Sequence, residues 1–420
     1  MMESSCPRNL LKDSRTLGTI ASRPHPELAE KAENLDDTIS LLVVQPTPFC
    51  NLDCGYCYLS PESRATKGYL SISDLSKVFT TIFDSSRVGP SLNVCWHAGE
   101  PLVLPPDYYR RAFNEIDKLA PAGTKLHHMI QTNGTLITDA WCELFREYNV
   151  EVGVSIDGPE HLHNRHRLDR RGRGTFSRVL SGIATLVKNN VPYYTLTVLT
   201  ESALDQPKLI FEFLLSLGVK EACFNVEECE GANKSTTFSS NAIERRVFNF
   251  FKQYYELLRD HNFPHWVREL DYAFNAVLLA KLDRPRNALV TPYRSINVDY
   301  MGNFSTFCPE LLGVETQAYG RFIFGNLISE PMHQAFTRQP YISVNADIQE
   351  GVRRCAESCS YFSLCGGGAP ANKLFENGTF VSTETVHCRL KIKTMIDLAL
   401  QIIESDFQIN ARLDIRPKEQ

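Results

Sequence analysis

The feature that most constrains this chain is a loop that carries three cysteines, Cys50, Cys54 and Cys57, spaced as Cys-x3-Cys-x2-Cys. Three thiolates held so close together can bind three irons of a [4Fe–4S] cube, which normally takes four cysteine ligands. The fourth iron would then stay open for another ligand. A zinc knuckle and a loop of reduced thiols are the alternatives. The flanks favour the cluster, because residues 41–44 read as a buried parallel strand and residues 96–101 close the next one.

At these residues the chain resembles the radical S-adenosylmethionine (SAM) enzymes, in which a CxxxCxxC loop holds the cluster and SAM chelates the open iron. Tyr56 precedes the third cysteine, and Gly99-Glu100-Pro101 follows the second strand, as in that family. The resemblance implies that one electron from the cluster cleaves SAM and gives a radical that abstracts hydrogen atoms. It also implies an external electron donor such as a flavodoxin or ferredoxin.

Two further segments resemble SAM-binding motifs of that family. They are Gln131-Thr-Asn-Gly134 and Ser155-Ile-Asp-Gly158, and Arg167 follows the second. The resemblance implies that Glu100 accepts hydrogen bonds from the SAM ammonium, that Ser155 touches the ribose, and that Arg167 pairs with the SAM carboxylate through its planar fork. The positions that match SAM contacts are Tyr56, Gly99, Glu100, Ser155 and Arg167.

Each of these motifs also has a plain structural interpretation. Gly99 and Pro101 could flank an ordinary turn around Glu100, and the basic stretch 161–173 could be a solvated loop or a nucleic-acid patch. The stretch is short and lacks an aromatic stacking platform, so we expect no nucleic-acid partner. Glu227, Glu228 and Glu230 end the sixth expected strand, where a substrate contact and a capped strand end are equally good explanations.

Composition narrows the class of protein. The chain has 420 residues, 43% of them hydrophobic and 22% charged, with a net charge of −5, as in an ordinary soluble protein. No apolar run approaches the ~20 residues of a membrane span, and the N-terminus lacks a signal-peptide core, so we expect no membrane partner. Thirteen cysteines in metal-like groups fit a reducing compartment, and we expect a cytoplasmic location.

Strand and helix patterns alternate six times, which predicts the α/β class and an open parallel (β/α)6 partial barrel with its site at the carboxyl ends of the strands. We expect a flexible arm over 1–38, the barrel over 39–235, a bridge of two long helices over 236–290, and a cysteine-rich domain over 291–420. Residues 295–388 suggest short strands and turns, with Gly302 in a hairpin, before a last helix from about Lys391 to Glu404.

The C-terminal cysteines resemble a SPASM domain, the extension that carries auxiliary clusters in many peptide-modifying radical SAM enzymes. The resemblance implies one auxiliary [4Fe–4S] cluster on Cys355, Cys359, Cys365 and Cys388, a full set of four. The chain departs from the family, since Ala369 replaces a cysteine and the cysteines of a second auxiliary cluster are missing. Cys308 is then left without a cluster. A structural zinc and a second cluster completed by unusual ligands are the alternatives.

The run from Gly366 to Cys388 resembles the cyclophane-forming maturases of glycine-rich-repeat precursor peptides. That resemblance implies a carbon–carbon cross-link between an aromatic ring and a side-chain Cβ of a precursor peptide, with Glu228 or Glu310 as a base suggested by position only. Sulfatase maturases, which make formylglycine, share the motifs, but they carry an aspartate where Pro309 stands here. An iron–sulfur electron-transfer or scaffold protein is the alternative from another class. The sequence identifies neither the precursor, the linked residues nor the oligomeric state.

Overall fold

The computed structural model describes residues 38–239, 242–279 and 287–414. All but the last residue of the expected N-terminal arm therefore lies outside the described residues.

A sheet of parallel strands forms the centre of the molecule and confirms the α/β class with an open parallel sheet. Its first six strands lie side by side in chain order, as expected from six successive βα units. Each pairs in parallel with the next, as Leu42 with Val94 and Val94 with His128 illustrate. The strands are β1 (Ile39–Val44), β2 (Val88–Trp96), β3 (Lys125–Thr132), β4 (Glu151–Ser155), β5 (Tyr193–Leu199) and β6 (Glu221–Val226).

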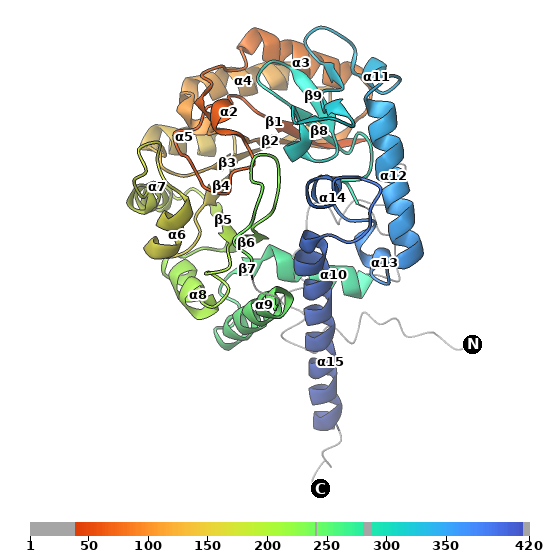
Figure 1. Ribbon diagram of the computed structural model, residues 1–420. Helices are drawn as coiled ribbons and strands as arrows, with labels where there is room; N and C mark the ends of the chain where they lie inside the picture. The colour runs from red at the N-terminus through yellow and green to blue at the C-terminus, as the bar shows by residue number, and fades with distance from the viewer. Residues whose placement is uncertain (1–37, 240–241, 280–286, 415–420) are drawn as a thin grey trace, which may run out of the picture.

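Helices cover the outer face of this sheet (Figure 1). In α3 (Ile72–Asp84), the Ser71 side chain accepts a hydrogen bond from the Asp74 amide and caps the first turn. Leu75, Val78 and Phe79 lie on one face of α3 and are fully buried, each contributing about 1.5–3 kcal/mol. The other outer helices are α4 (Pro106–Leu119), α5 (Asp139–Glu147), α6 (Glu160–His166), α7 (Phe176–Lys188) and α8 (Pro207–Ser216).

The sheet extends beyond the six expected strands on both sides. β7 (Trp266–Val267) pairs with β6, while β8 (Ser295–Val298) pairs in parallel with β1. β9 (Asn303–Thr306) and β12 (Gly325–Asn326) follow β8 in antiparallel order. Strands from the expected second domain thus continue the barrel sheet. Gly302 makes the turn between β8 and β9 with φ +80°, which confirms its hairpin role.

The expectation of short strands and turns is confirmed over 295–326, where β8 to β12 lie, but it was wrong over 332–377, where four helices lie. An 18-residue helix, α12 (Tyr341–Ser358), buries Tyr341, Val344 and Ile348 at helical spacing. The other elements are η4 (Pro309–Leu311), β10 (Glu315–Thr316), β11 (Gly320–Arg321), α11 (Met332–Ala335), α13 (Phe362–Cys365), α14 (Pro370–Asn377), the π-helix η5 (Cys388–Lys393) and α15 (Thr394–Asp414).

The two bridging helices are present as expected, as α9 (Ile243–Asp260) and α10 (Arg268–Leu279). They pack with α8 and α15 around a second apolar core. Figure 1 shows α15 (dark blue) beside α9 and α10 and then running out from the body of the molecule. In the described part of the chain, no helix combines the length and apolar character needed to cross a bilayer.

Candidate active site

The three-cysteine loop follows the carboxyl end of β1 and is fixed by backbone hydrogen bonds. The Asp53 amide donates to Leu168 O at 2.8 Å, and the Gly55 amide donates to His166 O at 2.9 Å. The Cys50 amide donates to Arg64 O at 3.0 Å, on the short helix α2 (Pro61–Ala65). The loop is therefore held against the segment that contains Arg167, which the sequence places far away.

The three thiols of this loop lie near one another. Burial raises the pKa of the Cys50 thiol, and the charges of Glu100, Cys54 and Cys57 raise it further. Burial also raises the pKa of Cys54 to about 12, against the lowering effect of Arg167. Thiolates are the ligands of iron–sulfur clusters, and a cubane takes one cysteine on each iron. The donor set therefore fits three corners of a cube.

The described residues contain no group of three or more His, Cys, Asp or Glu side chains placed to hold a single metal ion. A zinc ion needs its sulfur ligands at about 2.3 Å from one centre, whereas a cube spreads its cysteines over four irons.

Gly99 and Glu100 connect the end of β2 to the cluster loop. Gly99 has φ +81°, and a Cβ there would lie 2.3 Å from Thr47 O and 3.0 Å from Phe49 O. Only glycine fits, because the backbone of residues 47–49 runs directly against it. The close approach of the backbone at Gly99 is thus explained by the loop itself. The SAM contacts of Gly99 and Glu100 stay predictions.

The Glu100 carboxylate is buried and joins three loops. It accepts hydrogen bonds from the Leu102 amide at 3.0 Å, from Thr132 Oγ1 at 2.6 Å and from the Asn133 amide at 2.8 Å. Burial raises its pKa to about 7. Asn133 also places its side-chain amide 4.0 Å from Cys50 Sγ. Glu100 is thereby held beside the cluster loop, where its remaining lone pair can accept another donor.

Ser155 and Arg167 lie on the other side of the loop. Ser155 ends β4 and accepts a hydrogen bond from Gln131 Nε2 at 3.1 Å. Arg167 donates to both oxygens of Asp157, at 3.0 and 3.1 Å, and the Tyr56 hydroxyl donates to the same carboxylate. Burial raises the pKa of Asp157, but the charges of Arg167 and His163 and the hydrogen bonds from Arg167 and Tyr56 together outweigh it and leave the pKa below its ordinary value. The predicted SAM contacts of Ser155, Arg167 and Tyr56 stay predictions.

The structure brings the four C-terminal cysteines together. Cys355 is on α12, Cys359 caps its end, Cys365 ends α13, and Cys388 begins η5. Burial raises the pKa of Cys365, and the charges of Cys355 and Cys359 raise it further. Burial raises the pKa of Cys388 to about 12, with Cys365 and Cys359 adding to it. The four thiols thus form one group, as a complete ligand set requires.

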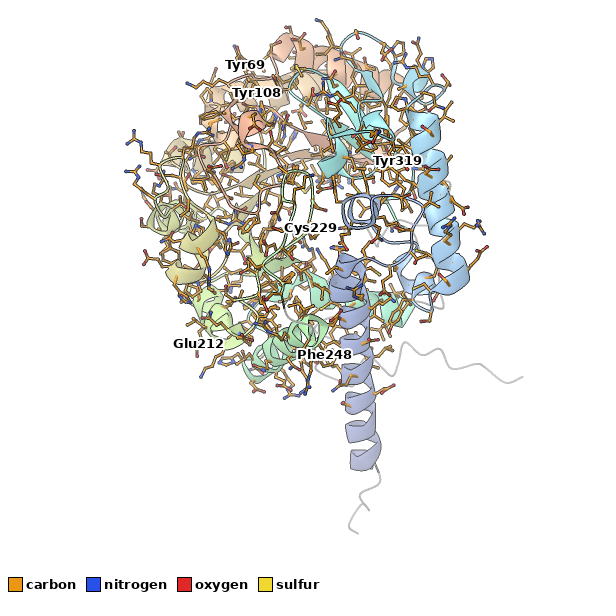
Figure 2. The ribbon with its side chains drawn as sticks, viewed as in Figure 1. Tyr69, Tyr108, Glu212, Cys229, Phe248 and Tyr319 are labelled. Carbon is orange, nitrogen blue, oxygen red and sulfur yellow. The ribbon has the colours of Figure 1, made fainter. Side chains whose placement is uncertain are left out.

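Cys308 lies apart from that group, beside three carboxylates. It is buried, and after burial the charges of Glu310, Glu230 and Glu228 raise its pKa. His387 Nδ1 lies 3.0 Å from Glu228 Oε1, and Asn372 Nδ2 donates to Glu228 Oε2 at 2.7 Å. These contacts join the loop after β6 to α14 and to the residue before Cys388. Figure 2 marks this loop by Cys229, near the centre of the view.

A cavity of about 530 Å³ lies between the cluster loop and the C-terminal region. Tyr58 and Leu59, which directly follow Cys57, line one side, and Glu310 lies on another. Lys234, Asp299 and Arg321 add charges of both signs. The rest of the lining mixes apolar residues, Val43, Pro48, Val298, Tyr300, Met301, Pro309, Leu312 and Val314, with the polar residues Gln45, Ser60, Ser63, Thr66 and Asn297. Glu228 and Glu230 are not among the lining residues.

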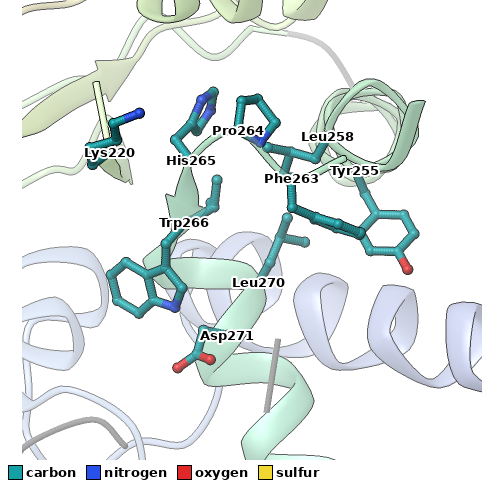
Figure 3. A pocket seen from close by; sticks show the side chains of 10 residues that line it. Lys220, Tyr255, Leu258, Phe263, Pro264, His265, Trp266, Leu270 and Asp271 are labelled. Atoms are coloured by element: carbon teal, nitrogen blue, oxygen red, sulfur yellow. The ribbon is translucent and has the colours of Figure 1, made fainter. Parts of the chain in front are cut away.

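A smaller cavity, of about 120 Å³, lies elsewhere (Figure 3). Lys220 and Trp266 line it, at the starts of β6 and β7. The amino ends of parallel strands lie opposite the carboxyl ends, so this cavity lies at the edge of the sheet opposite the three-cysteine loop.

Sequence reasoning missed several residues of the site. Asp157 lay within a quoted motif, but its pairing with Arg167 joins residues on either side of α6, which no spacing rule predicts. Thr132 and Asn133 were quoted only as part of a motif, and they proved to hold Glu100. A signal was available, since polar residues that directly follow parallel strands meet at one edge of the sheet.

Comparisons with known proteins agree with this site. A family profile described as the Radical SAM superfamily matches residues 44–214. The uncharacterized protein sll1766 of Synechocystis sp. is 37% identical over 370 residues, which cover 87% of this chain and 92% of that protein. The serine-type anaerobic sulfatase-maturating enzyme of Klebsiella aerogenes is 36% identical over 186 residues, only 44% of this chain and 46% of the enzyme.

Solved structures share the fold at low sequence identity. The structure of anSMEcpe with bound AdoMet has a TM-score of 0.70 at 20% identity and covers 87% of this chain and 98% of that one. Streptococcus suis SuiB bound to the precursor peptide SuiA has a TM-score of 0.58 at 16% identity, covering 92% and 82%. At such identities the likeness establishes the arrangement of the elements alone.

Proposed function

Because the chain belongs to the radical SAM superfamily, we propose that it modifies a ribosomally made precursor peptide by linking an aromatic ring to a nearby side-chain Cβ. The chain is an enzyme that uses a [4Fe–4S] cluster together with SAM, and its cysteine-rich C-terminal region fits an auxiliary cluster. The proposed parts are the substrate class, a precursor peptide, and the bond formed, a carbon–carbon cross-link.

The cavity beside Tyr58 and Leu59 is the observation that carries this proposal. Its volume of about 530 Å³ is that of a pocket for a sizeable ligand, and it begins directly after Cys57. The apolar part of its lining, which includes Val298, Leu312 and Val314, suits aromatic side chains, while Lys234 and Arg321 can bind backbone carbonyls or carboxylates. A peptide bound there would place a side chain close to the loop that we propose holds the cluster. Two proteins of similar fold were solved with peptides, anSMEcpe with Cp18Cys and SuiB with SuiA, which supports a peptide substrate.

We assign Cys50, Cys54 and Cys57 to the SAM cluster, and Cys355, Cys359, Cys365 and Cys388 to one auxiliary cluster. When bound, the SAM cluster and SAM supply a radical that removes one hydrogen atom from the substrate Cβ. In this proposal Arg167, held by Asp157, directs its remaining donors to the SAM carboxylate. Glu100, held by three donors, accepts from the SAM ammonium through its free lone pair.

The overall change balances as follows. One hydrogen atom leaves Cβ, a bond forms between Cβ and a ring carbon, and the ring then loses one proton and one electron to regain aromaticity. A cluster held by Cys355, Cys359, Cys365 and Cys388 would accept the electron, and a carboxylate of the chain would accept the proton. Glu310 suits this task better than Glu228, because Glu310 lines the cavity whereas Glu228 is engaged by His387 and Asn372.

Formylglycine formation is the second candidate. The 36% identity to a serine-type sulfatase-maturating enzyme over 186 residues favours it. Pro309 argues against it, because the aspartate of those enzymes is absent at that position. The two candidates oxidise the peptide to the same extent when a serine is modified, since both remove the equivalent of a hydrogen molecule. Only the location and reactivity of the product separate them.

Mass spectrometry after anaerobic co-expression with candidate precursor peptides tests the proposal. We expect the loss of one hydrogen molecule per cross-link and a block without backbone fragments between the joined residues. The Cys54→Ala variant should leave the peptide unmodified. Its matched control is Cys229→Ala, which should still modify the peptide. An altered serine or cysteine that reacts with hydrazine would instead establish the aldehyde of formylglycine.

A further inference from the structure

The side chain of Lys373 lies buried in the C-terminal region, with 3% of the residue exposed. It projects from α14, which follows the glycine run Gly366–Gly368. Its ammonium Nζ donates to Gly351 O at 3.0 Å and lies 3.4 Å from the sulfur of Cys355. Among the residues that the structure describes, no carboxylate forms an ion pair with this ammonium. Apart from the Gly351 carbonyl, the hydrogen-bonding partner of this ammonium in the described part of the chain is a cysteine of the four-thiol group.

The surrounding backbone is shaped to admit this side chain. A Cβ on Gly351, within α12, would lie 3.2 Å from Lys373 Nζ and 2.1 Å from Phe380 O. Gly351 thus leaves room for both the Lys373 ammonium and the backbone at Phe380. A Cβ on Gly368 would make only an ordinary contact with the lysine, 3.9 Å from Lys373 Cε. The lysine is consequently held in one position by packing.

A buried ammonium is costly unless an opposite charge compensates it. Cys355 alone, as a neutral thiol, would not supply that charge. Four thiolates on a [4Fe–4S] cube would, because the assembly carries a net negative charge that increases on reduction. The hydrogen bonds and charges around the sulfurs are among the factors that set the reduction potential of such a cluster.

We propose that Lys373 is the counter-charge of the auxiliary cluster and raises its reduction potential through Cys355. The proposal rests on the proposed assignment of Cys355, Cys359, Cys365 and Cys388 to that cluster. A cation near a ligand sulfur stabilises the reduced, more negative state. The cluster accordingly accepts the electron released on ring closure more readily. Lys373 acts as a positioning residue and touches neither SAM nor the peptide.

The first cysteine group provides an internal contrast. The groups that donate to Cys50 Sγ are neutral, namely the Leu52 amide at 3.4 Å and the Asn133 side chain at 4.0 Å. The nearby guanidinium groups of Arg64 and Arg167 are each paired with a carboxylate, Asp53 and Asp157. A cluster that must reduce SAM needs a low potential, so an unpaired cation would be unfavourable there. The charges around the sulfurs therefore favour a lower reduction potential for the SAM cluster and a higher one for the auxiliary cluster, as their proposed tasks require.

The reduction potential of the auxiliary cluster tests this inference. The full chain is reconstituted with iron and sulfide in a Cys50→Ala, Cys54→Ala and Cys57→Ala background, so that only the auxiliary cluster gives a signal. Electron paramagnetic resonance then follows its reduction at set potentials. We expect Lys373→Met to lower the equilibrium constant for reduction at least about tenfold, which is a shift of about 59 mV for a one-electron couple. Lys373→Arg should keep most of the original potential.

Lys208→Met, on the solvent-exposed side of α8, is the matched control and should leave the potential unchanged. An unchanged potential in a fully loaded Lys373→Met variant would overturn the proposal. If that variant loses its iron, Lys373→Gln replaces it. Loss of iron in both neutral variants, with retention in Lys373→Arg, supports the counter-charge. Equal loss in all three variants refutes it, because packing alone would then explain the lysine.

The test separates this inference from the proposed function, since it needs no peptide. If Cys355→Ala left the auxiliary iron content unchanged, the cluster assignment itself would fail. If the assignment stands and only the potential is insensitive to Lys373, the inference about the lysine fails alone.

Discussion

Arg167 binds the carboxylate of Asp157 in a bidentate manner, donating from Nε to Oδ2 at 3.0 Å and from Nη2 to Oδ1 at 3.1 Å. The hydroxyl of Tyr56 donates to the same carboxylate. The pair thereby ties the three-cysteine loop to the segment that follows β4. A guanidinium has five donors, so Arg167 retains N–H groups that another carboxylate can accept. Structural pairing and SAM binding are thus compatible in one side chain.

Replacing Arg167 by alanine separates these two roles. We expect a loss of about 3–5 kcal/mol in the free energy of unfolding, because the buried charge of Asp157 is left unpaired. We also expect SAM binding to weaken by about 1.5–3 kcal/mol, the value of a hydrogen bond to a charged group. Chemical denaturation and calorimetric titration with SAM measure the two effects. The exposed Arg171→Ala is the control, and full SAM affinity in a folded Arg167→Ala variant would remove Arg167 from the SAM site.

Iron content tests both cysteine groups at once. After anaerobic reconstitution we expect about eight irons per chain, four for each cluster. Cys54→Ala should remove about half of the iron and all SAM cleavage, whereas Cys359→Ala should remove the other half and leave the SAM cluster loaded. Cys229→Ala is the matched control, since this thiol lies outside both groups. About twelve irons, or zinc in the C-terminal group, would contradict the assignment of a single auxiliary cluster.

Gly99 and Gly123 form a natural pair for testing the close contact beside the cluster loop. Both have positive φ, +81° and +90°, but a Cβ on Gly123 meets nothing within 4 Å. Gly123→Ala should therefore cost only the backbone strain of about 1–2 kcal/mol. Gly99→Ala adds a collision with Thr47 O and must displace the loop. We expect it to reduce iron incorporation at the first site, whereas equal iron content in the two variants would show that the loop adjusts freely.

The barrel could be predicted because a short local sequence pattern marks each of its strands and helices. Each strand is a short apolar run, and each helix carries a stripe such as Leu75, Val78 and Phe79, so six units and the motifs at their carboxyl ends could be recognised. The same reasoning missed α6, since seven residues with only Leu162 and His163 buried give no stripe. It also missed α12, although Tyr341, Val344 and Ile348 have helical spacing, because the nearby cysteines and glycines suggested turns.

Long-range contacts were beyond sequence reasoning. Parallel pairing of β8 with β1 joins segments more than two hundred residues apart, and nothing in Ser295–Val298 indicates its partner. The cysteine ligand groups could be proposed from spacing and resemblance alone. Lys373 could not, since its contact with Cys355 depends on the packing of α14 against α12.

The last prediction concerns the base. Glu310 is surrounded by Glu228, Glu230, Tyr58, His387 and Lys391. Burial raises its pKa from 4.5 to about 7, and the charge of Glu228 adds to this. A raised carboxyl pKa means that the folded state binds the proton more tightly, so the stability contributed by Glu310 falls as pH rises from about 4.5 to about 7. Proton acceptance has the opposite trend, because only the ionised carboxylate can act as a base.

We therefore expect cross-link formation per SAM cleaved to rise with pH through about 7. Glu310→Gln should lower product formation by about 10²–10⁴-fold, the usual contribution of a general base, and should abolish this pH dependence. Iron content and SAM cleavage should be retained, since Glu310 belongs to neither cysteine group, and Glu315→Gln on exposed β10 is the control. Paired measurements of 5′-deoxyadenosine and cross-linked peptide distinguish the outcomes. If Glu310→Gln forms product at the normal rate with the same pH profile, the proton goes elsewhere, and Glu310 is a structural carboxylate of the cavity wall.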